Sequence, residues 1–316
     1  MKEHRSFSKI VLLLLCCIGA AWLCAALLYN DNRPLERKTQ AGQGGPAGSS
    51  GVSGYRETAV FSFNVPGARS IAVDAEGYIW IAGSGALVKH GPDSRRLLEI
   101  PLPEPAHAAA AGADGRIYVA FKRHIRVYGP LGRKISEWTG LGEKAYLTSL
   151  SVQHGLAAAA DYGQRTVWCF DTGGRLRGRI TGPEKTGFIM PSASFDAAVA
   201  ESDRLWVVHP GQRKVQLYAI AGALLRSWGE STARMSGFCG CCNPAHIALL
   251  PDGAVVTSEK GIRRVKVYDR LGRLNSVVAS SEKLGRGNSG FDIAVDSGGK
   301  IYILDTVKNI VRIFAG

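Results

Sequence analysis

The stretch "FDIAVDSGGKIYILDTVKNIVRIF", residues 291–314, contains three short apolar runs separated by two polar turns. The runs are rich in β-branched and aromatic residues, and the turns "DSGG" and "DTVKN" contain Asp, Gly and Asn. Such runs are typical of strands, and such turn residues let the chain reverse sharply. The stretch therefore predicts three antiparallel strands.

Comparable stretches recur along the chain, and most continue into a third and a fourth strand. The six repeat cores are "SIAVDAEGYIWIAG", "AAAAGADGRIYVAF", "TSLSVQHGLAAAAD", "DAAVAESDRLWVVH", "HIALLPDGAVVTSE" and "DIAVDSGGKIYILD". Turn glycines such as Gly77, Gly115, Gly253 and Gly299 recur at roughly forty to fifty residues, which is the spacing of propeller blades. Helix-period stretches are almost absent after residue 30. We expect an all-β, six-bladed β-propeller.

The repeats resemble those of the NHL-repeat family of β-propellers, whose units read roughly as an apolar strand, an Asp-x-x-Gly turn, "hIYVaD" and "RIxxFdxxG". The resemblance covers about residues 60–316, and residues 291–314 match best; blade three lacks the acidic turn residue and blade four lacks the glycine. The last unit stops after its third strand. The segment "TAVFSFNV", Thr58 to Val65, is therefore predicted to supply its outer strand and close the ring.

The first 54 residues predict an export and anchor segment. A basic tail, residues 1–9, precedes twenty uncharged, mostly apolar residues, 10–29, long enough to cross a bilayer as a helix. We expect an uncleaved signal anchor, with a cleaved signal peptide as the alternative. A flexible Gly/Ser/Pro linker, residues 30–54, would then lead to a propeller, residues 55–316, in the periplasm or outside the cell.

The chain is basic, with a formal net charge of +13. Its charges are scattered through turns, with no basic helix and no RNA-binding signature, so the composition speaks against nucleic acid. A solvated positive surface explains the charge, and attraction to anionic lipid or an acidic partner is the alternative.

The first residue of each inner strand is expected to face the central channel. These residues are Ser70, Ala108 (or His107), Thr148, Asp196, His246 and Asp292. Three adjacent blades thus offer Asp, His and Asp, a possible ligand set for a metal or a polar substrate. The alternative is that these polar groups only solvate the channel.

Other candidate binding residues lie in loops of the same face, which form a polar and largely basic rim. They are His124, His209, Arg213, Lys260 and Arg263.

The loop "FCGCCNP" joins blades four and five and holds Cys239, Cys241 and Cys242. The cysteines could bind Zn or Cu with His246 as a fourth ligand, form a redox-active or local disulfide, or form a structural disulfide. Buried inert thiols are the remaining alternative, and they suit Cys169, in the strand "TVWCFD", better than this loop. The pairing of "CGCCNP" with "TSEKG" resembles a subgroup of exported bacterial NHL propellers, and no activity is implied by that likeness.

Three functions compete. The first is a membrane-tethered binding module with a protein or small-molecule ligand on the loop-bearing face, since no Gly-x-Ser-x-Gly, His-Glu-x-x-His or phosphate loop is present. The second is a metal-dependent enzyme, because six-bladed lactone hydrolases and an amidating lyase of similar architecture hold metals in the channel; the full ligand sets of those families are not matched here. The third is a purely structural envelope protein.

Overall fold

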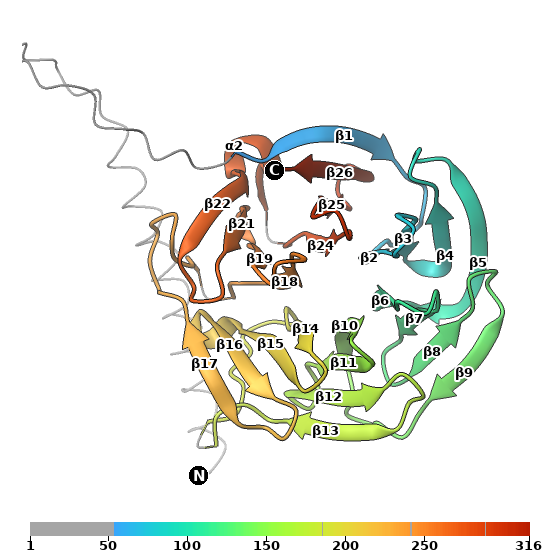
Figure 1. The fold of residues 1–316 in the computed structure, drawn as a ribbon, viewed down its shortest axis with the longest axis horizontal. Coiled ribbons are helices and arrows are strands. Elements are labelled where there is room, and N and C mark those ends of the chain that lie inside the picture. The colour runs from blue at the N-terminus through green and yellow to red at the C-terminus, as the bar shows by residue number, and fades with distance from the viewer. Residues whose placement is uncertain (1–53, 185, 241, 288) are drawn as a thin grey trace, which may run out of the picture.

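The computed structural model describes residues 54–316 except 185, 241 and 288, and these residues form a ring of six four-stranded antiparallel sheets (Figure 1). The innermost strands contact one another in chain order around the ring, and the last contacts the first. The predicted all-β, six-bladed propeller is therefore confirmed.

Each blade consists of four strands, in order from the innermost outward. Blades one to three comprise β2 (Ser70–Val73), β3 (Ile79–Ala82), β4 (Ser84–His90) and β5 (Arg96–Pro105); β6 (Ala108–Ala111), β7 (Ile117–Ala120), β8 (Ile125–Tyr128) and β9 (Lys134–Trp138); and β10 (Leu147–Gln153), β11 (Leu156–Asp161), β12 (Thr166–Asp171) and β13 (Leu176–Ile180). Blades four to six comprise β14 (Ala197–Glu201), β15 (Arg204–His209), β16 (Lys214–Ala219) and β17 (Leu224–Trp228); β18 (His246–Leu249), β19 (Val255–Ser258), β21 (Val265–Tyr268) and β22 (Leu274–Ala279); and β24 (Asp292–Val295), β25 (Ile301–Asp305), β26 (Ile310–Ala315) and β1 (Arg56–Ser62). Short elements in the connecting loops are η2 (Pro210–Gln212), α2 (Ser281–Leu284) and a small pair, β20 (Gly261–Ile262) with β23 (Arg286–Gly287).

The first strand of the fold closes the ring, as the sequence predicted, but it spans Arg56–Ser62 and not Thr58–Val65. β1 pairs antiparallel with β26, with Arg56 opposite Ala315 and Ser62 opposite Ile310. Glu57 on β1 also forms 2.8 Å ion pairs with Arg312 on β26 and Lys283 on α2. The last blade thus combines strands from both ends of the folded region, so the edge of β26 is covered.

The Asp-x-x-Gly turns fix large aromatic residues in the core. In blade one, Asp74 accepts backbone hydrogen bonds that form the turn, and its Oδ2 accepts a 2.9 Å bond from Trp80 Nε1. In blade six, Asp296 accepts a 2.9 Å bond from Tyr302 OH. Trp80, Tyr302 and also Trp206 are buried between blades, as expected from their second-strand positions. The polar atom of a buried Trp or Tyr is usually satisfied by such a partner.

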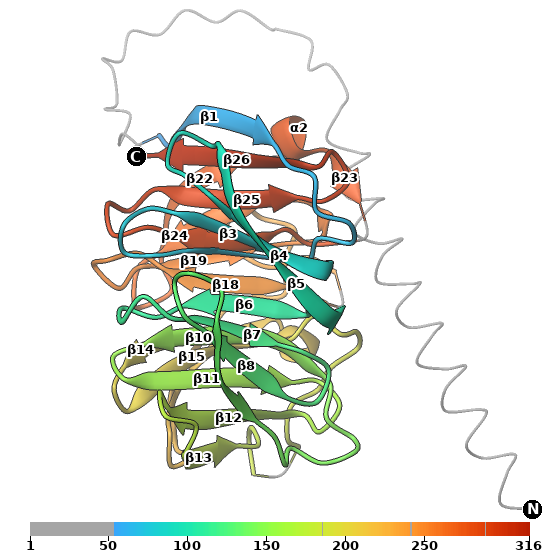
Figure 2. The same cartoon turned by 90° about the vertical axis from the view of Figure 1, so that its right-hand side faces the viewer.

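Antiparallel pairing gives the ring two distinct faces, at the left and right edges of the side view in Figure 2. One carries the turns between first and second strands and between third and fourth strands; we call it the turn face. The opposite face carries the blade connectors, including residues 229–245, and the loops between second and third strands; we call it the loop face. The inner strands begin at the loop face.

Within the described residues, no helix is long and apolar enough to cross a membrane. The anchor at 10–29, the tail at 1–9 and the linker at 30–54 fall on the part of the chain before the described residues, apart from residue 54, and stay predictions.

We predict that deleting residues 56–62 destabilises the propeller, whereas deleting seven linker residues, 40–46, does not. The first deletion removes several backbone hydrogen bonds, each worth about 1 kcal/mol. Since each kcal/mol shifts the unfolding midpoint of a domain of this size by roughly 2–4 °C, the midpoint should fall by about 10 °C. Equal midpoints for the two deletions, measured by calorimetry, would contradict this closure.

Candidate functional site: the channel and the cysteine loop

Polar side chains tie each pair of neighbouring blades together near the loop-face end of the channel. The contacts in ring order are Ser70 Oγ with Ala109 N (3.0 Å), His107 Nδ1 with Leu147 O (2.8 Å), Thr148 Oγ1 with Phe195 O (2.7 Å), Asp196 Oδ2 with Ile247 N (3.1 Å), Ser258 Oγ with Phe291 N (3.1 Å) and Asp292 Oδ2 with Ile71 N (2.8 Å). We call these six contacts the inter-blade bonds. Five of the six use a side chain at or next to the start of an inner strand, so the channel-facing polar groups hold the ring together.

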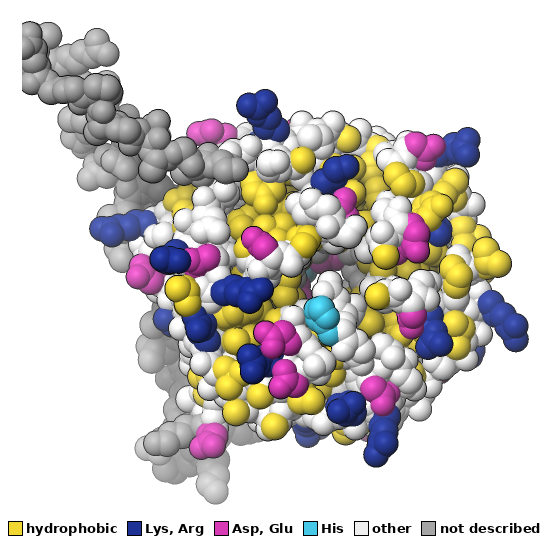
Figure 3. Space-filling model, viewed as in Figure 1, with side chains coloured by type: hydrophobic (Ala, Val, Ile, Leu, Met, Phe, Trp, Pro, Cys, Tyr) yellow, Lys and Arg dark blue, Asp and Glu magenta, His cyan; other side chains and the backbone are white. Residues whose placement is uncertain are grey.

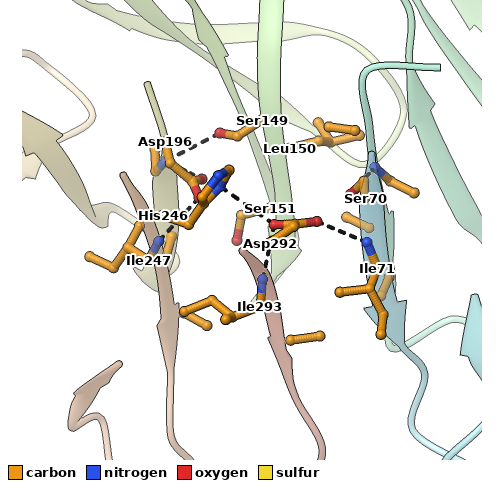
Figure 4. Close-up of a pocket in the computed structure, with 18 of the residues that line it drawn as sticks. Ser70, Ile71, Ser149, Leu150, Ser151, Asp196, His246, Ile247, Asp292 and Ile293 are labelled. Atoms are coloured by element: carbon orange, nitrogen blue, oxygen red, sulfur yellow. Dashed lines mark hydrogen bonds and ion pairs between the residues drawn. The ribbon is translucent and has the colours of Figure 1, made fainter. Parts of the chain in front are cut away.

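Three channel residues converge as the sequence suggested they could. His246 Nδ1 lies 3.3 Å from Asp196 Oδ2 and 3.6 Å from Asp292 Oδ1 (Figure 4). These residues begin, or directly precede, the inner strands of blades four, five and six. They line a channel cavity of about 130 Å³. One imidazole therefore faces two carboxylates in a space that water can reach.

The electrostatics favour a protonated imidazole between the two carboxylates. Burial acts to lower the pKa of His246, but hydrogen bonding to Asp196 and the charges of both carboxylates raise it on balance. Burial, together with the charge of Asp196, raises the pKa of Asp292, and His246 opposes that shift. A positive charge between the carboxylates is thus the favoured state of the site.

The same arrangement could hold a cation in place of the proton. The ligand atoms of Asp196, His246 and Asp292 lie within 4.8 Å of one another, and this is the one such group of His, Cys, Asp or Glu among the described residues. Two carboxylates and an imidazole suit a transition metal such as Zn²⁺ or Mn²⁺. Each carboxylate already accepts two backbone hydrogen bonds, which orient its oxygens for such a role.

A buried charge network supports the segment that leads into the cysteine loop. Glu259 and Lys266 are fully buried; Glu259 pairs with Arg264 at 2.6 Å and with Lys266 at 2.7 Å. The Lys266 ammonium also donates to the carbonyls of Met235 and Gly237 and lies over the Phe238 ring. Burial lowers the pKa of Lys266 to about 8, while Glu259 opposes that shift.

Asn243 fastens the loop itself to its neighbour. Its buried amide donates to the carbonyls of Cys239 (2.6 Å) and Lys260 (2.9 Å), and its oxygen accepts from the backbone N–H of Lys260 (2.9 Å). Arg213, from the adjacent blade, donates to the carbonyl of Gly240 at 2.8 Å. The pairing of "CGCCNP" with "SEKG" in the sequence is therefore a set of direct contacts.

The described cysteines are in different states. Cys239 is disulfide-bonded and Cys242 is buried, while Cys241 lies outside the described residues. Cys169 is a fully buried free thiol, as expected, and burial raises its pKa to about 12. The disulfide at Cys239 favours the disulfide alternatives for this loop over thiolate ligation. His246, the expected fourth ligand, pairs with the channel carboxylates instead.

Two expected rim residues do not project to solvent. His209 is fully buried: its Nε2 accepts from Ile189 N at 2.8 Å and its Nδ1 contacts Gln216 Oε1 at 3.0 Å. Arg263 is buried against Phe291 and donates to Ser289. The sequence could not reveal this, because the connector loops that cover both side chains have no repeat pattern. Both residues therefore support connector loops of the loop face through hydrogen bonds, His209 at Ile189 and Arg263 at Ser289.

The other three, His124, Arg213 and Lys260, are partly exposed. His124 stacks on Phe121 and lies 3.6 Å from Glu104. Lys260 Nζ donates to Ser192 (2.7 Å) and Ser194 (3.2 Å), bridging the loop after blade five's second strand to the connector that leads into blade four.

Sequence reasoning missed Asn243, Glu259, Arg264 and Lys266 as supports of the loop. The available signal was a charged residue at an inward position of a strand, since Lys266 occupies the middle of "RVKVY". Buried Lys and Glu are rare unless paired, so such a position points to a partner.

No family model and no curated protein matches this chain. Among solved structures, it is similar to a crystal structure of the WD40 β-propeller domain of Doa1. The two share 15% sequence identity with a TM-score of 0.57, and the match covers 78% of each chain. The likeness supports the β-propeller fold and carries no information about the site.

We predict that the stability conferred by His246 depends on pH. Because the pKa of folded His246 is raised, its contribution is complete below about pH 6.5, the unfolded value, and is lost as pH rises through the folded pKa. In chelator, the unfolding midpoint should fall over this range in the native chain and change less in His246→Gln. His154→Gln, at an exposed turn, is the control and should behave like the native chain. An unaltered pH profile in His246→Gln would contradict the assignment.

We predict that Asn243→Asp loosens the cysteine loop. A carboxylate cannot donate to the carbonyls of Cys239 and Lys260, so about 2 kcal/mol of stability should be lost. The Cys242 side chain should also react faster with a thiol reagent, after mild reduction, than in the native chain. Asn275→Asp, at an exposed position, should change neither quantity. Unchanged Cys242 reactivity in Asn243→Asp would show that the amide does not hold the loop.

Proposed function

We propose that this chain is a membrane-tethered, extracytoplasmic propeller of the NHL type that acts as a binding module. Its loop face would receive a protein or small-molecule ligand, with the cysteine loop at the contact. The membrane anchor in this proposal is the apolar segment 10–29 predicted from the sequence. The NHL type is taken from the resemblance of the repeats.

One observation carries the proposal: buried charges hold the segment that leads into the cysteine loop in a defined shape. Burying Glu259, Arg264 and Lys266 is costly, and such groups are tolerated when they fix a specific structure. Here they fix the backbone at Met235 and Gly237, just ahead of Cys239. A loop preorganised on the outside of a rigid scaffold binds with a smaller loss of entropy than a flexible one.

Site-specific photo-crosslinking in cells tests this proposal. A photoreactive residue in place of Lys122 or Lys308, both exposed on the loop face, should give a discrete adduct. The same residue in place of Ser297, exposed on the turn face, should give no protein adduct. The loop-face adduct should weaken in Asn243→Asp. Protein adducts of equal yield from both faces would contradict a dedicated loop-face partner.

The channel triad favours a second candidate, a metal-dependent enzyme. Asp196, His246 and Asp292 would hold the ion in the channel, and Lys260 would lie at its mouth. The ion would supply a Lewis acid for a polar substrate.

Elemental analysis of the purified chain, prepared without chelator, distinguishes the metal sites. A channel site predicts stoichiometric metal that is lost in Asp196→Asn and Asp292→Asn but kept in Cys242→Ser. A Zn or Cu site at the cysteine loop predicts the reverse pattern. Absence of metal from the native chain would remove the enzyme candidate and the loop-metal alternative together.

A further inference from the structure

We infer that the turn face lies against a bilayer that contains anionic lipids. This inference rests on the proposed membrane tether and adds an orientation and a lipid class to it. It starts from the five segments where third and fourth strands join in blades one to five, residues 91–97, 129–135, 171–177, 220–226 and 269–275. Each segment comprises the turn and the first residues of the outer strand. We call them the outer hairpins.

The outer hairpins concentrate exposed apolar side chains. In the described part of the chain, eleven large apolar side chains are exposed, and seven of them lie in these five segments. Leu131 and Leu271 are in the turns themselves, and the other five are on the outer strands within two residues of the turn: Leu97, Ile135, Leu176, Leu224 and Leu225. Leu131 is 88% exposed, Leu271 55% and Leu176 52%. Single exposed apolar residues are ordinary on a protein surface, but their gathering at the same place in five blades marks a surface that contacts something.

Basic residues accompany these apolar side chains. The five outer hairpins are rich in Lys and Arg, among them Arg95, Arg133, Arg175, Arg226 and Arg273, one from each blade. Figure 3, which shows one face of the ring, places Lys and Arg around the periphery, interspersed with apolar side chains and with Asp and Glu. Leucine next to arginine is the combination that binds the interface of an anionic bilayer, because the side chain can insert while the guanidinium meets a phosphate.

The chain from the predicted anchor enters the propeller on the turn face, and this favours the turn face as the one that meets the membrane. Blade six has no outer hairpin, because its outer strand β1 comes from the other end of the folded region. β1 begins beside the C-terminus: Arg56 pairs with Ala315, and Tyr55 lines a groove with Asp252 and Gly299 of the inner turns. Residues 54 and 55 therefore emerge on the turn face (Figure 2).

The predicted linker is short enough to keep this face near a membrane. A flexible chain of the linker's length, residues 30–54, has an end-to-end distance of roughly 30 Å. The outer hairpins surround the attachment point on the same face. With the turn face on the lipid, the loop face with its cysteine loop points away from the membrane.

Lipid photo-crosslinking of the full chain tests the inference. The chain would be reconstituted in vesicles of phosphatidylcholine with phosphatidylglycerol, with benzoylphenylalanine in place of Leu131 or Leu271. The control carries it in place of Val307, which is 68% exposed on the loop face. We expect lipid adducts at the two outer-hairpin positions at least about fivefold above the control, because the anionic interface attracts the Arg and Lys side chains of the outer hairpins. The yield should drop towards the control in pure phosphatidylcholine.

A charge variant provides an independent measurement. Arg133→Gln with Arg175→Gln, both in outer hairpins, should lower the lipid adduct at Leu271 severalfold. Lys122→Gln with Arg123→Gln, exposed on the loop face, should leave it unchanged. Equal yields from the two charge variants would show that the Arg side chains of the outer hairpins do not attract the lipid.

The remaining outcomes separate this inference from the tether. If the chain floats with the vesicles but positions 131 and 307 give equal lipid yields, the turn face does not lie on the bilayer. The membrane anchor at 10–29 is then still supported. If the photoreactive residue at position 131 crosslinks to a second copy of the chain instead of lipid, the outer hairpins form a protein interface and the inference is overturned. If the chain does not float, the anchor and the docking fall together, while the loop-face partner is still tested by its own adducts.

Discussion

The structure depends on the seams between blades. Each blade is a four-stranded sheet that cannot stand alone, and the ring exists because apolar faces pack between blades and a polar contact joins neighbouring blades at every seam. At two seams the contact is a carboxylate, Asp196 or Asp292, and a carboxylate near the channel must find a positive partner. His246, on the strand between them, supplies it. The candidate site is therefore also a structural joint.

This double role explains why the channel residues fit both a structural interpretation, with a proton on His246, and a metal site. A proton on His246 and a metal ion between the carboxylates satisfy the same electrostatic need, because either places positive charge between two anions. The backbone bonds to Asp196 and Asp292 persist in both cases, since they come from the strands that build the ring. A site of this kind can be stable without a ligand and still be preorganised for one.

The repeats predicted the fold well because propeller blades are local. Alternating strands, Asp-x-x-Gly turns and the unpaired strand near Thr58 each report on nearby residues, and counting from the turns placed Asp196, His246 and Asp292 together. The loop face was harder to predict. His209 and Arg263 were expected at the rim but are covered by connectors, and the paired charges of Glu259 and Lys266 lie on one hairpin, with their targets in another segment. Connectors of irregular length have no period from which burial can be deduced.

The buried pair of Glu259 and Lys266 gives the segment that leads into the cysteine loop a fixed shape. Native-state hydrogen exchange over residues 235–245 measures this most directly, because it reports how often the segment opens. We predict protection close to that of the inner strands in the native chain, and faster exchange in Glu259→Gln confined to this segment. Exchange as fast in the native chain as in the exposed outer hairpins would contradict it.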